Sequence, residues 1–273
     1  MTAAFFRLSG PLLTLLWCAA CTRPETQKAP TESPQATAAP APTPAVAAAT
    51  PDCRHPFGLY RNTELTYQIT DNNNKPQGLQ IMKVATITEH AAEKKAPAYT
   101  EVLLKSSLYD ADNKLLRNDE YVFSCRNDSV LTDGRLLLDP AMLRSFRDRR
   151  FGYEPIPLSW PNQPAAGNLP NGQLTVEVSS PSVDIAKVIT RVSRRRLIGP
   201  EAVTTPAGSF QAYKVESDYE YATQLRPDMI RRSIMRVVDF YVPTVGIVRT
   251  EFRANNGKLD RALVLTKRTD GQL

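Results

Sequence analysis

The strongest constraint on the fold is a period-two alternation of apolar and polar residues that begins near residue 57. In the segment PAYTEVLLKSSLYD, Ala98, Val102, Leu104 and Leu108 fall on one face. In SFQAYKVESDYEY, apolar and aromatic residues from Tyr213 to Tyr221 alternate with Lys214, Glu216, Asp218 and Glu220. The segment IRRSIMRVVDFYV has a shared apolar face that Arg232 and Arg236 interrupt, formed by Ile230, Ile234, Val238, Phe240 and Val242. Alternation of this kind is typical of strands in antiparallel sheets that bury one face and expose the other.

The segments between the alternating runs have hairpin-turn chemistry. Three connections combine Asn, Asp or Gly with a following Lys: DNNNKP at Asp71, DADNK at Asp110 and ANNGK at Ala254. Asn, Asp and Gly tolerate the positive φ angles that tight hairpins require. A fourth turn, TPAG, places Pro206 and Gly208 where a type I turn favours them.

One short helix is expected within DPAMLRSFRDRR, where Asp139 caps the first amides and Pro140 occupies the first helical position. Met142, Leu143 and Phe146 would then share a face. Residues 154–172 are rich in Pro and Gly and are interpreted as a connection between two halves of the sheet. The prediction is an all-β, mainly antiparallel domain over residues 53–273. It consists of a single curved, half-barrel or sandwich-like sheet of about 9–10 strands.

Residues 1–20 have the features of a secretory signal peptide: Arg7, an apolar run from Pro11 to Trp17, and small residues before Cys21. The apolar run is shorter than the roughly 20 residues that a transmembrane helix needs. The pattern resembles a bacterial lipobox, with Cys18 at the position where Leu is usual, and the resemblance implies lipidation of Cys21. A plain secretory signal and a C-x-x-C redox or metal site are the alternatives.

Residues 21–52 are interpreted as the lipidated N-terminus and a linker dominated by Pro, Ala and Thr, without aromatic residues. Such a composition cannot bury enough apolar surface to fold, so a disordered tether is expected. Thr22 and Arg23 follow Cys21, and neither an Asp retention signal nor an acidic surface-export run is present. These features favour export to the outer membrane, on its periplasmic face, with the lipid as the membrane anchor.

Cleavage before Cys21 and lipidation would leave Cys53 and Cys125 as the remaining cysteines. Two thiols in an oxidising compartment favour a disulfide, which would pin the start of the domain to the strand ending at Cys125. Two free thiols, or a metal site that includes His55, are the alternatives.

The chain offers few residues for catalysis. It has two histidines, and no motif typical of hydrolases, P-loop proteins, zinc proteases or EF-hands occurs. Paired carboxylates such as Asp218 and Glu220 are expected on a solvated strand face. We therefore expect a protein that is not an enzyme, has no cofactor and binds no metal.

Arginines form clusters, and those on neighbouring strands could build a basic stripe. The candidate anion-binding residues are Arg194, Arg196, Arg232 and Arg236. Guanidinium groups bind phosphate and carboxylate in a bidentate manner, so anionic lipids, lipopolysaccharide or acidic glycans are the expected ligands. A solvated strand face is the alternative, and nucleic acid is not expected in an exported protein.

Several motifs resemble those of the TapB-like family of exported bacterial proteins of unknown function. The run TTPAGSFQAYKVE starts at Thr204, and a later aromatic segment passes through Gly246 into a hairpin with Gly257 and Lys258. NTELTY at Asn62 and the two cysteines of the domain also match. The resemblance covers roughly residues 53–268 and implies an exported, curved β-sheet domain without assigned catalytic residues.

Three functional hypotheses follow. The first is a non-enzymatic envelope lipoprotein, monomeric, that binds an envelope protein partner or supports envelope assembly. The second is a carrier of a lipid or hydrophobic ligand on the concave face of the sheet, and an apolar cavity between sheet and helix would favour it. The third, least favoured, is an envelope hydrolase, which would need a convergent acid and base in a cleft.

Overall fold

The computed structural model describes residues 52–93 and 97–271. They belong to one compact unit. Residues 1–51, which contain the expected signal peptide, the lipidation site Cys21 and almost all of the expected tether, lie outside the described residues. Among the described residues, no helix is long and apolar enough to cross a membrane.

The first half of the domain contains five strands and three short 3-10 helices. In chain order they are η1 (Pro56–Gly58), β1 (Glu64–Asp71), β2 (Pro76–His90), β3 (Tyr99–Asp110), β4 (Leu115–Arg126), β5 (Ser129–Thr132), η2 (Gly134–Leu137) and η3 (Pro140–Phe146).

The second half contains nine strands, including the longest in the domain. They are β6 (Arg150–Ile156), β7 (Leu158–Pro161), β8 (Gly167–Asn168), β9 (Gly172–Ser180), β10 (Val183–Thr205), β11 (Gly208–Arg226), β12 (Met229–Val242), β13 (Gly246–Arg253) and β14 (Leu259–Thr269).

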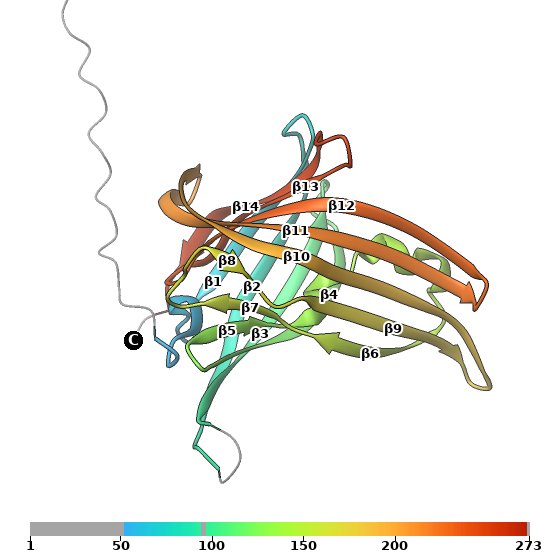
Figure 1. Ribbon diagram of the computed structural model, residues 1–273, viewed down its shortest axis with the longest axis horizontal. Helices are drawn as coiled ribbons and strands as arrows, with labels where there is room; N and C mark the ends of the chain where they lie inside the picture. Colours follow the sequence, from blue (N-terminus) through green and yellow to red (C-terminus); the bar gives the residue numbers. More distant parts are fainter. Residues whose placement is uncertain (1–51, 94–96, 272–273) are drawn as a thin grey trace, which may run out of the picture. The chain divides into compact units, whose positions relative to one another are not determined.

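The strands of the described residues form one antiparallel sheet with the order β6-β9-β10-β11-β12-β13-β14-β1-β2-β3-β4-β5-β7, and β8 pairs with β10 (Figure 1). The sheet curves into a nearly closed barrel. Its two edge strands are consecutive in the chain, since β6 ends at Ile156 and β7 begins at Leu158, and the two edges therefore lie close together. A single residue, Pro157, therefore joins the two edges. The predicted all-β fold with a single curved antiparallel sheet is confirmed.

The alternation places side chains on the expected faces of β11. Val215, Tyr219 and Tyr221 are buried, whereas the charged residues between them lie on the outer face, where they form ion pairs. On β12 the predicted apolar face points outward across the ladder with β11, and it is only partly buried: Val238 and Phe240 are buried, whereas Ile230 is exposed. Asp239 lies opposite Val215, so the interior of β12 carries Asp239 and its period-two neighbours, and Ile234 is exposed.

The predicted turns join consecutive strands. Asp71 accepts hydrogen bonds through Oδ1 from the amides of Asn73 and Lys75, both at 2.9 Å, and Asn74 has a φ of +59°. Asp110 repeats this arrangement in the turn between β3 and β4. The side chains of the Asx residues therefore fix the hairpin turns, and with them the register of the flanking strands.

The expected strand number and connection differ from the structure. The sheet has 14 strands rather than about 9–10, because β5, β7 and β8 are only two to four residues long. Residues 154–172, interpreted as a connection, include the end of β6 and both β7 and β8. Edge positions explain the error, because an edge strand tolerates prolines that a central strand excludes.

The expected helix forms at Pro140–Phe146 but as a 3-10 helix, with Asp139 as its cap. The Asp139 carboxylate accepts a hydrogen bond from the amide of Ala141 at 2.9 Å. Phe146 is buried, and Met142 and Leu143 are half-buried against the core. A helix of this length is not stable alone, so contacts with neighbouring elements hold it in place.

The disulfide between Cys53 and Cys125 is present, with a Cα–Cα distance of 5.1 Å. It joins the start of the described chain to β4, and Asn162 donates to the two sulfurs at 3.7 and 3.5 Å. Cys125 is fully buried, so this bridge belongs to the core.

Candidate functional site

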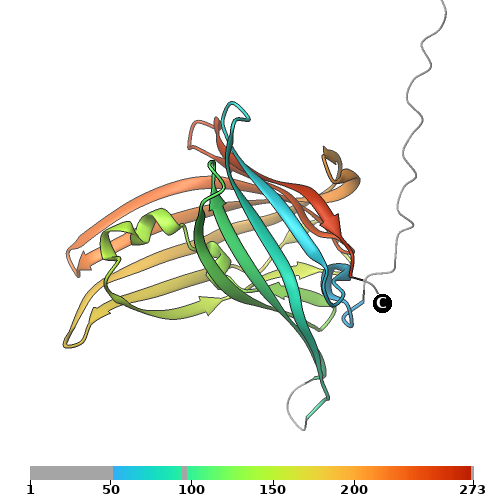
Figure 2. The same ribbon diagram turned by 180° about the vertical axis from the view of Figure 1, so that it is seen from behind.

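A cavity of about 260 Å³ lies between the concave face of the sheet and residues 133–149, which we call the strap. The strap contains η2 and η3 and runs across the inside of the curved sheet (Figures 1 and 2). Its Leu136, Leu137 and Leu138 line the cavity together with side chains of the sheet, such as Leu108 of β3 and Leu263 of β14. The cavity is therefore lined by elements far apart in sequence, is partly open to solvent and is mainly apolar.

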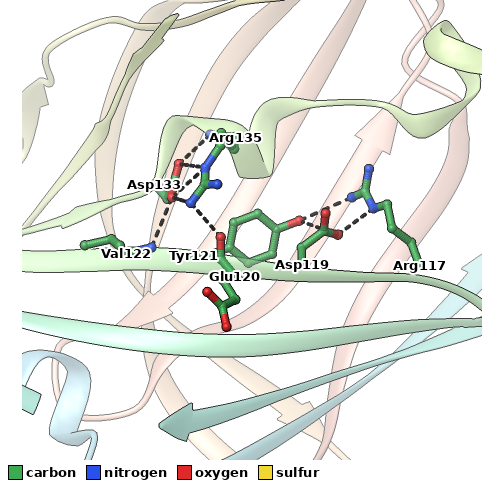
Figure 3. Close-up of polar contacts among 7 residues, drawn as sticks. All are labelled: Arg117, Asp119, Glu120, Tyr121, Val122, Asp133 and Arg135. Carbon is green, nitrogen blue, oxygen red and sulfur yellow. Dashed lines mark hydrogen bonds and ion pairs between the residues drawn. The ribbon is translucent and has the colours of Figure 1, made fainter. Parts of the chain in front are cut away.

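The first attachment of the strap is Asp133, at the end of β5 (Figure 3). Its buried carboxylate accepts hydrogen bonds from the amides of Val122 at 3.0 Å and Arg135 at 2.8 Å. It also binds the Arg135 guanidinium at 2.7 Å, and that guanidinium donates to the carbonyl of Glu120 at 2.5 Å. These bonds tie the start of the strap to β4.

Tyr121 connects this attachment to the cavity wall. The Arg135 guanidinium lies 5.7 Å from the centre of the Tyr121 ring. The Tyr121 hydroxyl donates to Asp119 and accepts from Arg117, both at 3.2 Å (Figure 3). Burial raises the pKa of Tyr121 well above its usual value, so the hydroxyl stays protonated. Its hydrogen bonds are already made within the protein.

The second attachment is an ion pair between the strap and β14. Asp139 Oδ2 lies 3.3 Å from both terminal nitrogens of Arg261. The Arg261 guanidinium also lies 4.4 Å from the ring centre of Phe252. Asp139 also caps η3, so one carboxylate both starts this helix and attaches it to β14.

Asp239 is the carboxylate in the cavity lining that makes no contact in the two attachments of the strap. It is 4% exposed and accepts a 2.6 Å hydrogen bond from the Thr250 hydroxyl. Burial raises the pKa of Asp239 to about 6, although the Thr250 hydrogen bond and the charge of Arg195 lower it. Tyr219 lies in the same wall, and burial together with Asp239 raises its pKa. The cavity thus has an acidic group in an apolar wall.

Arg195 provides a buried positive charge close to this wall. Its guanidinium donates to the carbonyls of Pro170 at 2.8 Å and Ser159 at 3.1 Å, and it lies 4.9 Å from the Trp160 ring centre. Burial lowers the pKa of Arg195. Across the described part of the chain, no contact within 4.0 Å links Arg195 to Asp239, so the two charges interact at longer range.

A β-bulge directs Arg195 inward. The register between β10 and β11 shifts between Ser193 and Arg196, and Arg194 has a φ of +51°. The extra residue reverses the alternation, so Arg194 and Arg196 point outward and Arg195 is buried. Three arginines in succession, Arg194, Arg195 and Arg196, carry no sequence signal that would single out the buried one.

Asp239 was missed for a related reason. Its neighbours Val238 and Phe240 belong to the apolar face predicted for this segment, so the alternation predicts Asp239 on the polar face. The one available signal was a single acidic residue within the apolar run VVDFYV.

The four candidate anion-binding arginines lie on the outer face of β10 and β12, on either side of β11. Arg194 forms an ion pair with Asp218 and Arg236 with Glu216, while Arg232 lies 3.6 Å from Glu220. Arg196 lies opposite Glu216 in the register. The structure therefore brings the arginines together but places a row of carboxylates between them, and anion binding there stays a prediction.

Metal binding has no obvious site in residues 52–93 and 97–271, which contain no group of three or more His, Cys, Asp or Glu side chains placed to hold a metal ion. The residues gathered at the cavity are instead suited to hydrogen bonding and apolar contact. Chemically, this arrangement can hold a small molecule with one polar group near Asp239.

Two solved structures share the fold. One is a candidate exported protein with a YmcC-like fold from Bacteroides fragilis, with a TM-score of 0.58, 19% identity, and coverage of 80% of this chain and 100% of that chain. The other is a candidate lipoprotein from Parabacteroides distasonis, with a TM-score of 0.63, 21% identity and the same coverage. No curated protein matches this chain.

A family model described as DUF3108-like matches residues 61–265, which include all of the sheet except its last few residues. The description names a domain of unknown function and no activity. It differs from the TapB-like name, so that finer assignment stays a prediction. The match spans most of the chain, and this protein therefore belongs to the DUF3108-like family.

Proposed function

We propose that this protein is a cell-envelope binding protein that holds a small hydrophobic or amphiphilic ligand in the cavity under the strap. The observation that carries the proposal is the 260 Å³ cavity itself, formed between the sheet and the strap and lined mainly by apolar side chains. Ligand sites are typically concave and mostly apolar with a few polar groups, so a cavity of this kind favours a ligand.

The volume limits the size of the ligand. An apolar cavity of about 150 Å³ accommodates benzene, and ligand pockets start at roughly 300 Å³. The 260 Å³ cavity therefore fits a small aromatic compound or a part of an acyl chain. Asp239 and Tyr219 would bind its polar group, with Asp239 accepting a hydrogen bond when ionised and donating one when protonated.

Binding without catalysis is favoured by how the acidic groups are used. Asp133 holds backbone amides and Arg135, and Asp139 pairs with Arg261. Asp239 is left without a second acid or base beside it in the described lining of the cavity. A hydrolase would need such a pair, so we favour the carrier over the hydrolase.

The proposed location is the outer membrane, on its periplasmic side, with Cys21 lipidated and the domain monomeric. Support comes from the signal-like N-terminus and the Cys53–Cys125 disulfide, which suits an oxidising compartment. The fold is also that of a candidate exported protein and a candidate lipoprotein. An envelope protein that receives the ligand is the partner that this role implies.

The test is binding of N-phenyl-1-naphthylamine, a neutral apolar fluorophore, to the full chain. Leu263→Trp adds bulk to the cavity wall, and we expect it to weaken binding at least about tenfold, which corresponds to about 1.4 kcal/mol. Ile198→Trp, at an exposed position of β10, is the matched control and should bind as the wild type does. Native mass spectrometry of the wild type should also detect a co-purified small molecule.

Equal binding by the wild type and Leu263→Trp would rule out the cavity as the site. A wild type that neither carries a ligand nor binds the fluorophore would contradict the proposed function as a whole. The same mass spectra report the proposed lipid on Cys21, which a Cys21→Ser variant would lack.

A further inference from the structure

Three segments far apart in sequence meet at one end of the sheet, and we call them together the hairpin end. They are residues 147–150, 180–187 and 225–232. The register joins them, because Arg150 lies opposite Ser179 and Lys187 lies opposite Gln224. The turns of the β9–β10 and β11–β12 hairpins lie on the same side of the domain in both views (Figures 1 and 2).

Large apolar side chains are exposed at the tips of both hairpins. Val183 is 62% exposed at the start of β10, and Met229 is 51% exposed at the start of β12. Leu225 and Ile230 flank the second turn and are also exposed. Scattered single apolar residues are normal on a surface, but four large ones at the tips of two neighbouring hairpins point to an interaction site.

The same segments carry an excess of positive charge. They contain seven basic and three acidic residues: Arg147, Arg149, Arg150, Lys187, Arg226, Arg231 and Arg232 against Asp148, Asp184 and Asp228. Within the described chain, Arg226 and Arg231 make no ion pair, whereas Arg232 lies 3.6 Å from Glu220 and Lys187 pairs with Glu177 at 2.8 Å. Two guanidinium groups next to the exposed apolar tips are therefore available to an anionic partner.

We propose that the hairpin end docks on an anionic lipid surface. Val183, Leu225, Met229 and Ile230 enter the boundary between headgroups and acyl chains, and the arginines bind the phosphate groups around them. Basic residues beside protruding apolar side chains suit this interface, because arginine can extend its charged end to the headgroups while its stem lies in the apolar layer. The complementary charge favours this occupant over a neutral protein surface.

This docking is independent of the cavity, whose lining includes none of these residues. It also differs from the stripe formed by Arg194, Arg196 and Arg236, which faces the carboxylates of β11. Arg232 alone belongs to both sets.

Single tryptophan probes test the proposal in the full chain, because they report local insertion even when another part of the protein anchors it. Met229→Trp is placed in vesicles of phosphatidylcholine with or without phosphatidylglycerol, both with brominated acyl chains. Leu116→Trp, 57% exposed at the β3–β4 hairpin, is the matched control. The wild-type emission is subtracted, and circular dichroism confirms folding.

We expect bromine to quench Met229→Trp in the anionic vesicles only, less so at high salt, and to leave Leu116→Trp unquenched. In the Met229→Trp chain, Arg226→Glu with Arg231→Glu should lower the insertion equilibrium at least about 25-fold, since each arginine near an anionic surface contributes about fivefold. Lys75→Glu with Lys114→Glu changes the net charge equally at other turns and should have no effect.

No quenching at Met229→Trp, or equal quenching of the two probes, would overturn the proposal. So would an identical response of the two double charge variants. The first result would leave the apolar tips to a protein partner or to a second copy of the chain.

Discussion

At the scale of single residues, two buried charges set the properties of the interior. Asp239 and Arg195 are both almost inaccessible to water, and neither is neutralised by a direct ion pair among the described residues. Arg195 is compensated by two carbonyls and the Trp160 ring, but among the described side chains only the Thr250 hydroxyl forms a hydrogen bond with the Asp239 carboxylate. Burial of an ionised carboxylate is unfavourable, so Asp239 reduces stability whenever it is charged.

The pH dependence of stability should reveal Asp239. Its pKa is about 6 in the folded protein and about 3.9 when unfolded, so the unfolded state releases its proton first as the pH rises. The penalty is absent below about pH 4 and complete above about pH 6, where it approaches about 3 kcal/mol. Asp239→Asn removes the titration, so its free energy of unfolding should rise relative to the wild type between pH 4 and pH 7.

Denaturant unfolding at the two pH values measures this difference. Asp71→Asn is an instructive control, because backbone hydrogen bonds from Lys75 and Asn73 lower the pKa of Asp71. Its carboxylate stabilises the fold above the unfolded pKa, and that contribution is lost as the pH falls. The free energy of unfolding of Asp71→Asn relative to the wild type should therefore fall, rather than rise, with increasing pH. A pH-independent difference between wild type and Asp239→Asn would contradict the assigned environment.

At the scale of elements, the strap is held by a few polar contacts rather than by helical stability. Its helices are 3-10 segments of four and seven residues, too short to be stable alone. Asp133 and Asp139 attach it to β4 and β14, which are separated in the sheet by β1, β2 and β3. The position of the strap over the cavity therefore depends on two carboxylates.

Asp133→Ala should loosen the strap selectively. It leaves the amides of Val122 and Arg135 without their acceptor, and each unsatisfied buried group costs about 1–3 kcal/mol. We expect hydrogen exchange of residues 134–146 to accelerate by about tenfold or more, with β10 and β11 unchanged. Asp148→Ala, at an exposed position of the same strap, should leave exchange as in the wild type. Uniform acceleration across the sheet would instead indicate global destabilisation.

Sequence reasoning predicted long strands and Asx turns because both depend on local patterns. It identified the faces of β11 and the cap at Asp139, where side-chain chemistry and backbone geometry agree. It missed β7 and β8, whose hydrogen bonds come from strands distant in sequence and whose own residues include Pro161 and Gly167. It also missed Arg195 and Asp239, because a one-residue bulge and the choice of inner face are decided by packing rather than by composition.

At the scale of the whole molecule, the disulfide joins the start of the domain to strand β4. Cys53 and Cys125 are 72 residues apart in the sequence, and the loop that they close includes β1 to β3 and most of β4. Cross-linking a loop of this length restricts the unfolded chain, which the chain-entropy model values at about 4 kcal/mol.

Cys53→Ser combined with Cys125→Ser should therefore lower the free energy of unfolding by up to about 4 kcal/mol in guanidinium titrations. Wild-type protein treated with a reductant should unfold at the same denaturant concentration as the double variant. Coincidence of the reduced and oxidised wild-type curves would mean that the bridge does not stabilise this domain.

The pairing of β1 with β14 has a consequence for how the chain is made. Glu64 lies opposite Thr269, so the first strand of the sheet finds its second neighbour only in the last strand to be synthesised. Contacts between such distant segments form slowly, because a long loop must close first. During synthesis and any passage across a membrane, β1 presents a bare edge of amides and carbonyls. A chain shortened by its final strand would keep that edge permanently and would tend to aggregate through it.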